Sequence, residues 1–161
     1  MEEISYEQLE LFPLITGTDS DRTQILLEQF RFMKKFIKEF EENGELLYLT
    51  DIEGEKARKV FQDETHADKT ANAVVLHEIR KWRYNEFRIA VTNIEMAHRM
   101  ILDEEARDAI EYRYFRGLPV MRAALELKMQ KSTFSRRLNA GIESIGNTLK
   151  MMGVLDRKWT F

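Results

Sequence analysis

The chain has 161 residues, of which 43% are hydrophobic and 33% are charged, with only seven glycines and two prolines. This length suits one domain, or one domain with an appendage, and so few helix-breaking residues predict an all-α fold. The absence of cysteine excludes disulfides and thiolate metal sites. No apolar run is long enough to cross a membrane, and the acidic start MEEISYEQLE is unlike a signal peptide, so we expect a cytoplasmic protein.

Residues 1–70 are predicted to form an N-terminal helical region. Asp19, Ser20 or Asp21 can cap a helix that runs to about Asn43, with Gly44 just past its end. Its apolar face is expected to hold Ile25, Leu26, Phe30, Met33, Phe36 or Ile37, and Phe40. The phenylalanines at 30, 32, 36 and 40 could stack on single-stranded bases, but aromatic residues at helical spacing favour a core role.

The pattern from Glu45 to Lys69 is weaker and predicts a short helix between loops, with a strand at 46–50 as the alternative. Residues 71–102 then predict one long connecting or oligomerisation helix. Its apolar stripe is Val75, Ile79, Trp82, Ala90, Ile94, Ala97 and Ile101. A helix of this length exceeds the usual globular size. Either it breaks near Tyr84 and Asn85, or it pairs lengthwise with another helix, for example one from a second chain, so a homodimer stays open.

Motifs for catalysis and for metal binding are missing from the sequence. His66, His77 and His98 lie far apart, and His77-Glu78 lacks the second histidine of a zinc-protease helix. There is no glycine-rich phosphate loop, nucleophile elbow or pair of carboxylates in an apolar setting. We therefore expect no enzyme, no metal and no cofactor.

Charge is distributed unevenly along the chain. Residues 112–161 carry ten basic and three acidic side chains, a formal charge of +7, while residues 1–111 carry 15 basic and 25 acidic side chains, or −10. The net charge of −3 thus conceals a basic C-terminal segment, which indicates a polyanion partner.

The segment 103–152 is predicted to be a helix-turn-helix with a support helix before it. Asp103 can cap the support helix, and Ala106, Ile110 and Tyr114 lie inward at steps of four, with Phe115 beside them. Arg113 and Arg116 suit the far end of this helix, before Gly117. Pro119 fits the first position of the next helix, Ala124 fits a close helix approach, and Leu127 and Met129 flank the turn.

The second helix of the pair has two distinct faces. Phe134, Leu138, Ile142, Ile145, Leu149 and Met152 share one apolar face, which predicts core. The opposite face and its flanks supply the candidate DNA-binding residues Lys131, Ser132, Thr133, Ser135, Arg136, Arg137 and Asn139, with Arg122, Lys128, Arg137 and Lys150 as phosphate ligands. Arg136 is the first candidate for reading a base, because arginine can donate two N–H groups to guanine.

Two positions depart from the usual pattern. Lys128 stands where such turns commonly hold glycine, and Gln130 is not a favoured N-cap, so Ser132 could start the helix later. Helix pairs with a short turn also occur in all-α proteins that do not bind nucleic acid. The basic, hydroxyl-rich face favours DNA.

Over about residues 100–150 the chain resembles the fourth region of bacterial sigma factors. Tyr114-Phe115-Arg116-Gly117-Leu118 and Ser132-Thr133-Phe134-Ser135-Arg136 carry this resemblance. The layout of the chain is more similar to the ArpU/RinA-type phage late transcription regulators. This resemblance implies a phage or prophage protein that binds double-stranded DNA at a late promoter in the bacterial cell, on the nucleoid, and recruits host RNA polymerase.

The sequence-based hypothesis is thus a sequence-specific transcription regulator, and an activator rather than a repressor. Two alternatives remain: a small terminase-like adaptor for phage DNA packaging, and an interaction module that binds polymerase or a sigma factor without DNA. Residues 153–161 form a tail, in which Trp159 and Phe161 are expected to fold back on the preceding helices.

Overall fold

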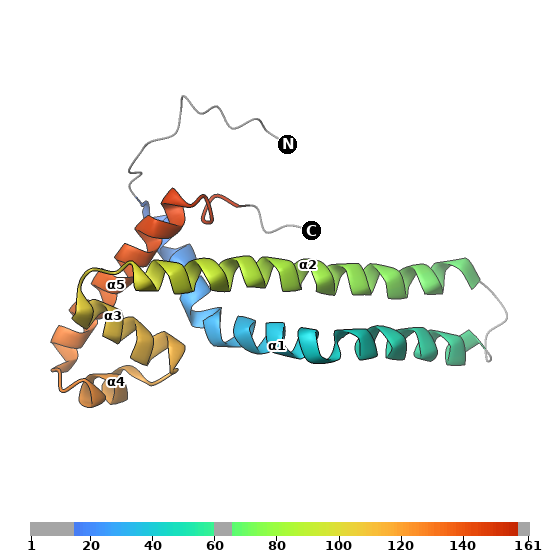
Figure 1. Ribbon diagram of the computed structural model, residues 1–161, viewed down its shortest axis with the longest axis horizontal. Coiled ribbons are helices and arrows are strands. Elements are labelled where there is room, and N and C mark those ends of the chain that lie inside the picture. Colours follow the sequence, from blue (N-terminus) through green and yellow to red (C-terminus); the bar gives the residue numbers. More distant parts are fainter. Residues whose placement is uncertain (1–14, 60–65, 158–161) are drawn as a thin grey trace, which may run out of the picture. The chain divides into compact units, whose positions relative to one another are not determined.

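The computed structural model of the chain describes residues 15–59 and 66–157, and all regular secondary structure in these ranges is helical (Figure 1). The elements are α1 (Gly17–Lys59), α2 (His66–Arg99), α3 (Glu104–Ile110), the π-helical turn η2 (Glu111–Phe115), α4 (Val120–Glu126) and α5 (Lys131–Met151). The all-α prediction is confirmed for this part of the chain. None of these helices is both long and apolar enough to cross a membrane.

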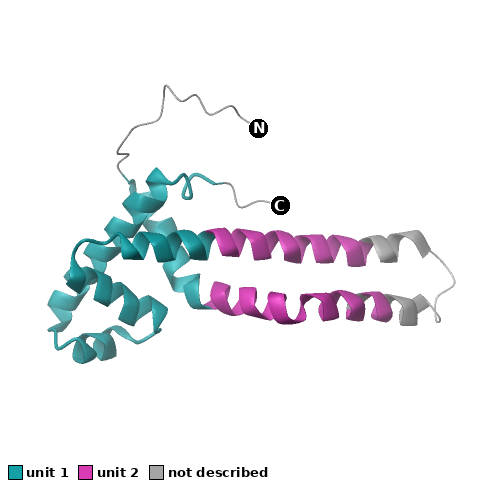
Figure 2. Cartoon of the chain, viewed as in Figure 1, with its two compact units in different colours: residues 1–31, 90–159 teal, residues 32–89, 160–161 magenta. Residues whose placement is uncertain are grey.

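The chain divides into two compact units, shown in Figure 2. Unit 1 comprises Met1–Arg31 with Ala90–Trp159, and unit 2 comprises Phe32–Ile89 with Thr160–Phe161. Helices α1 and α2 each contribute to both units. The boundaries expected near residues 70 and 102 therefore do not coincide with the boundaries of the units.

Helix α1 begins earlier and ends later than the sequence predicts. Thr16 and Asp19 cap its start reciprocally: the Thr16 N–H donates to the Asp19 carboxylate at 2.9 Å, and the Asp19 N–H donates to the Thr16 hydroxyl at 3.2 Å. The predicted end at Gly44 is wrong, because α1 continues to Lys59. A glycine inside a helix costs only about 1 kcal/mol, and the ring of Phe40 packs over Gly44.

Helix α2 runs for 34 residues without the break considered at Tyr84 and Asn85. Within unit 2 it pairs lengthwise with α1 in antiparallel fashion (Figure 2). Ring contacts mark the seam: Phe36 with Phe87 at 5.1 Å, Phe40 with Tyr84 at 4.6 Å, and Tyr48 with His77 at 4.3 Å between centroids. The sequence predicts a short helix between loops at 45–69, with a strand at 46–50 as the alternative. Both predictions are wrong for residues 45–59, because pairing with α2 keeps this part of α1 helical. Residues 60–65 lie outside the described ranges.

The predicted apolar faces of the two long helices are correct in unit 1 and partly wrong elsewhere. Leu26 and Phe30 are buried as expected, and the Phe30 ring stacks on Phe115 at 4.2 Å. Ile25 is 52% exposed, and Leu27 takes its place in the core. In unit 2, Phe32 and Val75 are 58% and 50% exposed, because a pair of helices covers only one side of each.

Unit 1 holds the main core. Ile94 of α2, Ile110 of α3, and Phe134, Ile145 and Leu149 of α5 are almost completely buried. The start of α1 approaches α5 closely, since a Cβ atom on Gly146 would lie 3.1 Å from the Thr23 hydroxyl. After α5 the chain folds back with Val154 and Leu155 buried, and the Arg22 guanidinium donates to the Leu155 carbonyl. Met152 is 53% exposed and does not join the core as predicted, while Trp159 and Phe161 lie outside the described residues.

Candidate nucleic-acid interface

The support helix α3 starts as the sequence predicts. The Asp103 carboxylate accepts hydrogen bonds from the backbone N–H groups of Glu105 at 3.0 Å and Ala106 at 3.3 Å. It thereby satisfies two of the donors that a helix start leaves open. Ala106, Ile110 and Tyr114 are buried, as their spacing indicates, and burial raises the pKa of the Tyr114 phenol.

The connection from η2 to α4 depends on Gly117. This glycine has a φ of +73°, a left-handed conformation that favours glycine, and the Arg31 guanidinium occupies the space that a side chain would need. The Arg113 guanidinium donates to the Leu118 carbonyl at 3.2 Å, which fixes the turn. Pro119 is the N-cap of α4 and not its first helical residue, a shift of one position from the prediction.

A four-residue turn, 127–130, links α4 to α5. Lys128 adopts a φ of +56°, and it is the one residue other than glycine with positive φ in the described ranges. The Met129 N–H donates to the Ala124 carbonyl at 2.9 Å, and the Lys128 N–H donates to the Leu125 carbonyl at 3.1 Å. The departure noted at Lys128 therefore leaves the turn intact, with a lysine in the conformation that glycine usually takes.

Helix α5 begins at Lys131 with Gln130 as its N-cap, and Gln130 makes no side-chain capping bond. The alternative start at Ser132 is wrong. Phe134, Leu138, Ile142, Ile145 and Leu149 are all buried, so the predicted core face holds for these five residues. Ala123 and Ala124 of α4 are buried too, as the expected close approach requires.

The opposite face of α5 carries an exposed polar row. Lys131, Ser132, Arg136 and Asn139 are exposed, and Thr133 and Ser135 are half-buried at its flanks. Within the described part of the chain, no ion pair or hydrogen bond engages the side chains of Lys131, Ser132, Arg136 or Asn139. Donors without a partner in the protein are available to a ligand outside it.

Two basic candidates are engaged within unit 1 instead. Arg137 contacts Asp103 at 2.8 Å and Glu105 at 2.7 Å, both on the N-terminal turn of α3. Lys150 contacts Asp156 at 2.8 Å and Asp19 at 3.4 Å, and its side chain is 21% exposed. Lys150 also lies about 28 Å along the helix from Lys131. We therefore assign Arg137 a positioning role and remove Lys150 from the candidate interface.

Arg122 and Lys128 remain candidates for phosphate contacts. The Arg122 side chain is 67% exposed, and its guanidinium pairs with Glu126 one turn along α4, at 3.1 Å. Such an exposed pair contributes under about 1 kcal/mol and separates readily when a phosphate competes. Lys128 is exposed on the turn itself.

One residue of this face was missed from the sequence. Glu143 is exposed and follows Asn139 by four residues, on the row that Ser132, Arg136 and Asn139 begin. Its carboxylate repels phosphate, which would confine any DNA contact to the part of α5 that precedes it. Alternatively, the carboxylate could accept a hydrogen bond from a cytosine amino group. The spacing that defined the row could have identified it.

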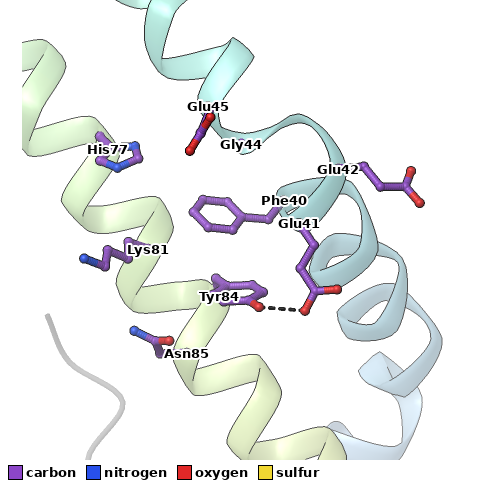
Figure 3. A pocket seen from close by; sticks show the side chains of 9 residues that line it. All are labelled: Phe40, Glu41, Glu42, Gly44, Glu45, His77, Lys81, Tyr84 and Asn85. Atoms are coloured by element: carbon purple, nitrogen blue, oxygen red, sulfur yellow. Dashed lines mark hydrogen bonds between the residues drawn. The ribbon is translucent and has the colours of Figure 1, made fainter.

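No metal site accompanies this surface, since the described residues contain no group of three or more histidine, aspartate and glutamate side chains able to hold an ion. Unit 2 contains a cavity of about 390 Å³ between α1 and α2 (Figure 3). Its lining includes Glu41, Glu42 and Glu45, and the Tyr84 hydroxyl donates to Glu41 at 2.6 Å, which raises the pKa of Tyr84. A cavity lined by three carboxylates does not suit a nucleic acid.

In comparisons with known proteins, no family model, no curated protein and no solved structure matches this chain. The assignment of function therefore depends on the residues of unit 1 and on their geometry.

Proposed function

We propose that this protein is a sequence-specific regulator of transcription that binds double-stranded DNA with the N-terminal half of α5. The observation that carries the proposal is the row of Lys131, Ser132, Arg136 and Asn139, which is exposed and has no partner within the described residues. A tight turn precedes it, and a buried face holds the helix against α3 and α4. Recognition helices that present their first turns to the major groove also follow a tight turn and pack by a buried face, which supports the proposal.

The residues divide by chemistry into readers and anchors. Arg136 and Asn139 are suited to paired hydrogen bonds with guanine and adenine, respectively. Lys128, Lys131 and Arg122 supply cations for phosphates, and Ser132, Thr133 and Ser135 supply hydroxyls for phosphates or base edges. The +7 charge of residues 112–161 supports the same partner.

The resemblance to sigma region 4 and to the ArpU/RinA-type regulators supports a more specific role. We propose an activator of phage or prophage late genes that works with host RNA polymerase in the bacterial cytoplasm. Met121 and Leu125, one turn apart on α4 and 61% and 73% exposed, give an apolar contact that a protein partner such as polymerase can use. That contact also favours a second candidate, a polymerase-binding or sigma-binding module that does not touch DNA. No feature of the described residues favours the packaging adaptor.

Selection from a random duplex pool tests the proposal, at moderate salt so that non-specific phosphate binding is suppressed. We expect one enriched motif. Replacing Arg136 by alanine should weaken binding to that motif by roughly 1 to 3 kcal/mol and relax one base position. The variant Lys128→Ala should weaken all duplexes alike, and Lys35→Ala, an exposed lysine of unit 2, is the matched control.

The outcomes distinguish the candidate functions. No enrichment, combined with retained binding to polymerase or a sigma factor, would replace the proposal by the interaction module. An equal loss on every sequence from Arg136→Ala would remove its base-reading role while leaving DNA binding in place.

A further inference from the structure

Unit 2 has almost no core of its own. Among the described residues of unit 2, Met33 and Ala73 are the only ones with a buried apolar side chain, and Gly44 is buried as well. All other buried apolar residues that the structure describes belong to unit 1. The ring contacts between α1 and α2 involve half-buried side chains and the exposed Phe32. Two long helices that cover only one stripe of each other are marginal in water, and bundles of four helices are a common stable solution.

The paired helices of unit 2 have two unlike flanks. The cavity lies on one flank, where Glu41 and Glu45 of α1 meet Lys81 and Asn85 of α2 (Figure 3). Successive residues of a helix are rotated by about 100° around its axis. Leu47, two residues after Glu45, therefore lies about 200° away, on the other side of α1. Arg83 follows Lys81 by two residues and therefore lies on the opposite side of α2 from Lys81.

The second flank is apolar. On α1 it carries Phe32, Phe36 and Leu47, which are four and eleven residues apart and so share one side of the helix. On α2 it carries Leu76 and Ile79, and Ile79 lies one turn before Arg83. Phe32, Leu47 and Leu76 are 58%, 44% and 44% exposed. We call Phe32, Phe36, Leu47, Leu76 and Ile79 the apolar flank. Asn43 lies between Phe36 and Leu47 on the same face of α1. Exposed apolar side chains that gather on one flank can still mark an interface.

We propose that the apolar flank binds the same flank of a second copy of this chain, so that two pairs of helices form a four-helix bundle. This proposal is independent of DNA binding. The charges at the edges of the flank favour a second copy, because Glu39 borders it on α1 and Arg83 borders it on α2. A two-fold axis parallel to the helices sets α1 of each copy against α2 of the other and brings each Glu39 near an Arg83.

The same axis matches the apolar residues. The ring centroids of Tyr48 and His77 lie 4.3 Å apart, so their neighbours Leu47 and Leu76 lie at about one level of the helix pair. The two-fold operation therefore places Leu47 of one copy beside Leu76 of the other, twice in the dimer. The opposite flank, with its carboxylates and cavity, stays in solvent.

Sedimentation velocity of the full chain tests this proposal. At micromolar concentration we expect the wild-type protein to have an apparent mass of twice the 19.1 kDa chain mass. We expect the double variant Leu47→Glu/Leu76→Glu to be a monomer. The matched control is Leu49→Glu/Val74→Glu, which alters two exposed apolar residues at the same level on the cavity flank and should remain dimeric. Helix content from circular dichroism shows that each variant is folded.

Charge exchange provides the second arm. Glu39→Arg and Arg83→Glu should each weaken the dimer about tenfold, because each juxtaposes like charges, and the two together should restore it. A monomeric wild type, a dimer that survives Leu47→Glu/Leu76→Glu in a helical protein, or a dimer that only the control variant breaks would overturn the proposal. Failure here would leave DNA binding by unit 1 untouched, and the duplex selection tests that separately.

Discussion

Arg137 of α5 contacts Asp103, the residue that caps α3, at 2.8 Å, and the two lie 34 positions apart in the sequence. The same guanidinium contacts Glu105 at 2.7 Å. A single basic side chain thus ties the start of α5 to the start of its support helix. Its neighbour Arg136 is exposed, so two adjacent arginines have different environments.

Asp103 should contribute more as a cap than as an ion-pair partner. We expect Asp103→Ala to lower the free energy of unfolding by about 0.5 to 2 kcal/mol, because two backbone donors lose their acceptor. Asp103→Asn keeps an acceptor oxygen and should cost less than about 1 kcal/mol, since both ion-pair partners are over two-fifths exposed. Urea denaturation measures both variants, with Arg137→Ala completing a double-mutant cycle. Equal losses from alanine and asparagine would contradict the capping role.

Lys128 offers a stabilising substitution. Its φ of +56° costs a residue with a Cβ atom about 1 to 2 kcal/mol, so Lys128→Gly should raise the free energy of unfolding by about 1 kcal/mol. Lys128→Ala removes the same charge and keeps the strain, and it should leave stability nearly unchanged. Thermal denaturation separates the two variants. If both stabilised the protein equally, charge rather than backbone conformation would be the cause.

Gly141 should not tolerate a methyl group. A Cβ atom there would lie 2.6 Å from Cγ1 of Ile110 and 3.0 Å from the Ala106 carbonyl oxygen. Such overpacking should make Gly141→Ala destabilising by about 1 to 3 kcal/mol. Gly54→Ala is the control, because a Cβ atom there would meet no heavy atom within 4 Å beyond the adjoining backbone of its own helix, and it should stabilise by roughly 0.5 to 1 kcal/mol. Chemical denaturation checks both, and a stable Gly141→Ala would show that α3 and α5 can separate.

Asp19 should make stability depend on pH in the acid range. The backbone N–H of Thr16, opposed in part by burial and assisted by Lys150, lowers the pKa of the Asp19 carboxyl below its usual 3.8. A lowered pKa means that the stabilisation is present above that usual value and is lost as pH falls through the lower, folded-state value. Asp19→Asn should therefore lose less stability than wild type from about pH 5 to about pH 2, while Asp21→Asn, an exposed neighbour, should follow wild type. Denaturation at a series of pH values measures this, and identical slopes for all three proteins would remove Asp19 as the cause.

The sequence by itself determined the features that depend on neighbouring residues. The start of α3 at Asp103, the end of the support helix before Gly117 and the five-residue buried stripe of α5 all follow from capping chemistry, backbone sterics and helical periodicity. The exposed row from Lys131 to Asn139 is the other side of the same periodicity. These features act within a few residues, so a linear pattern contains them.

Only the tertiary structure decided how far α1 extends and which basic residues remain available. Pairing with α2 carries α1 through Gly44, where local propensity predicts an end. Arg137 and Lys150 have the same charge as Arg136 in the sequence, but Asp103 and Asp19, which lie far from them along the chain, engage them in unit 1. Charge is a property of one residue, whereas an ion pair requires two residues that folding brings within about 4 Å.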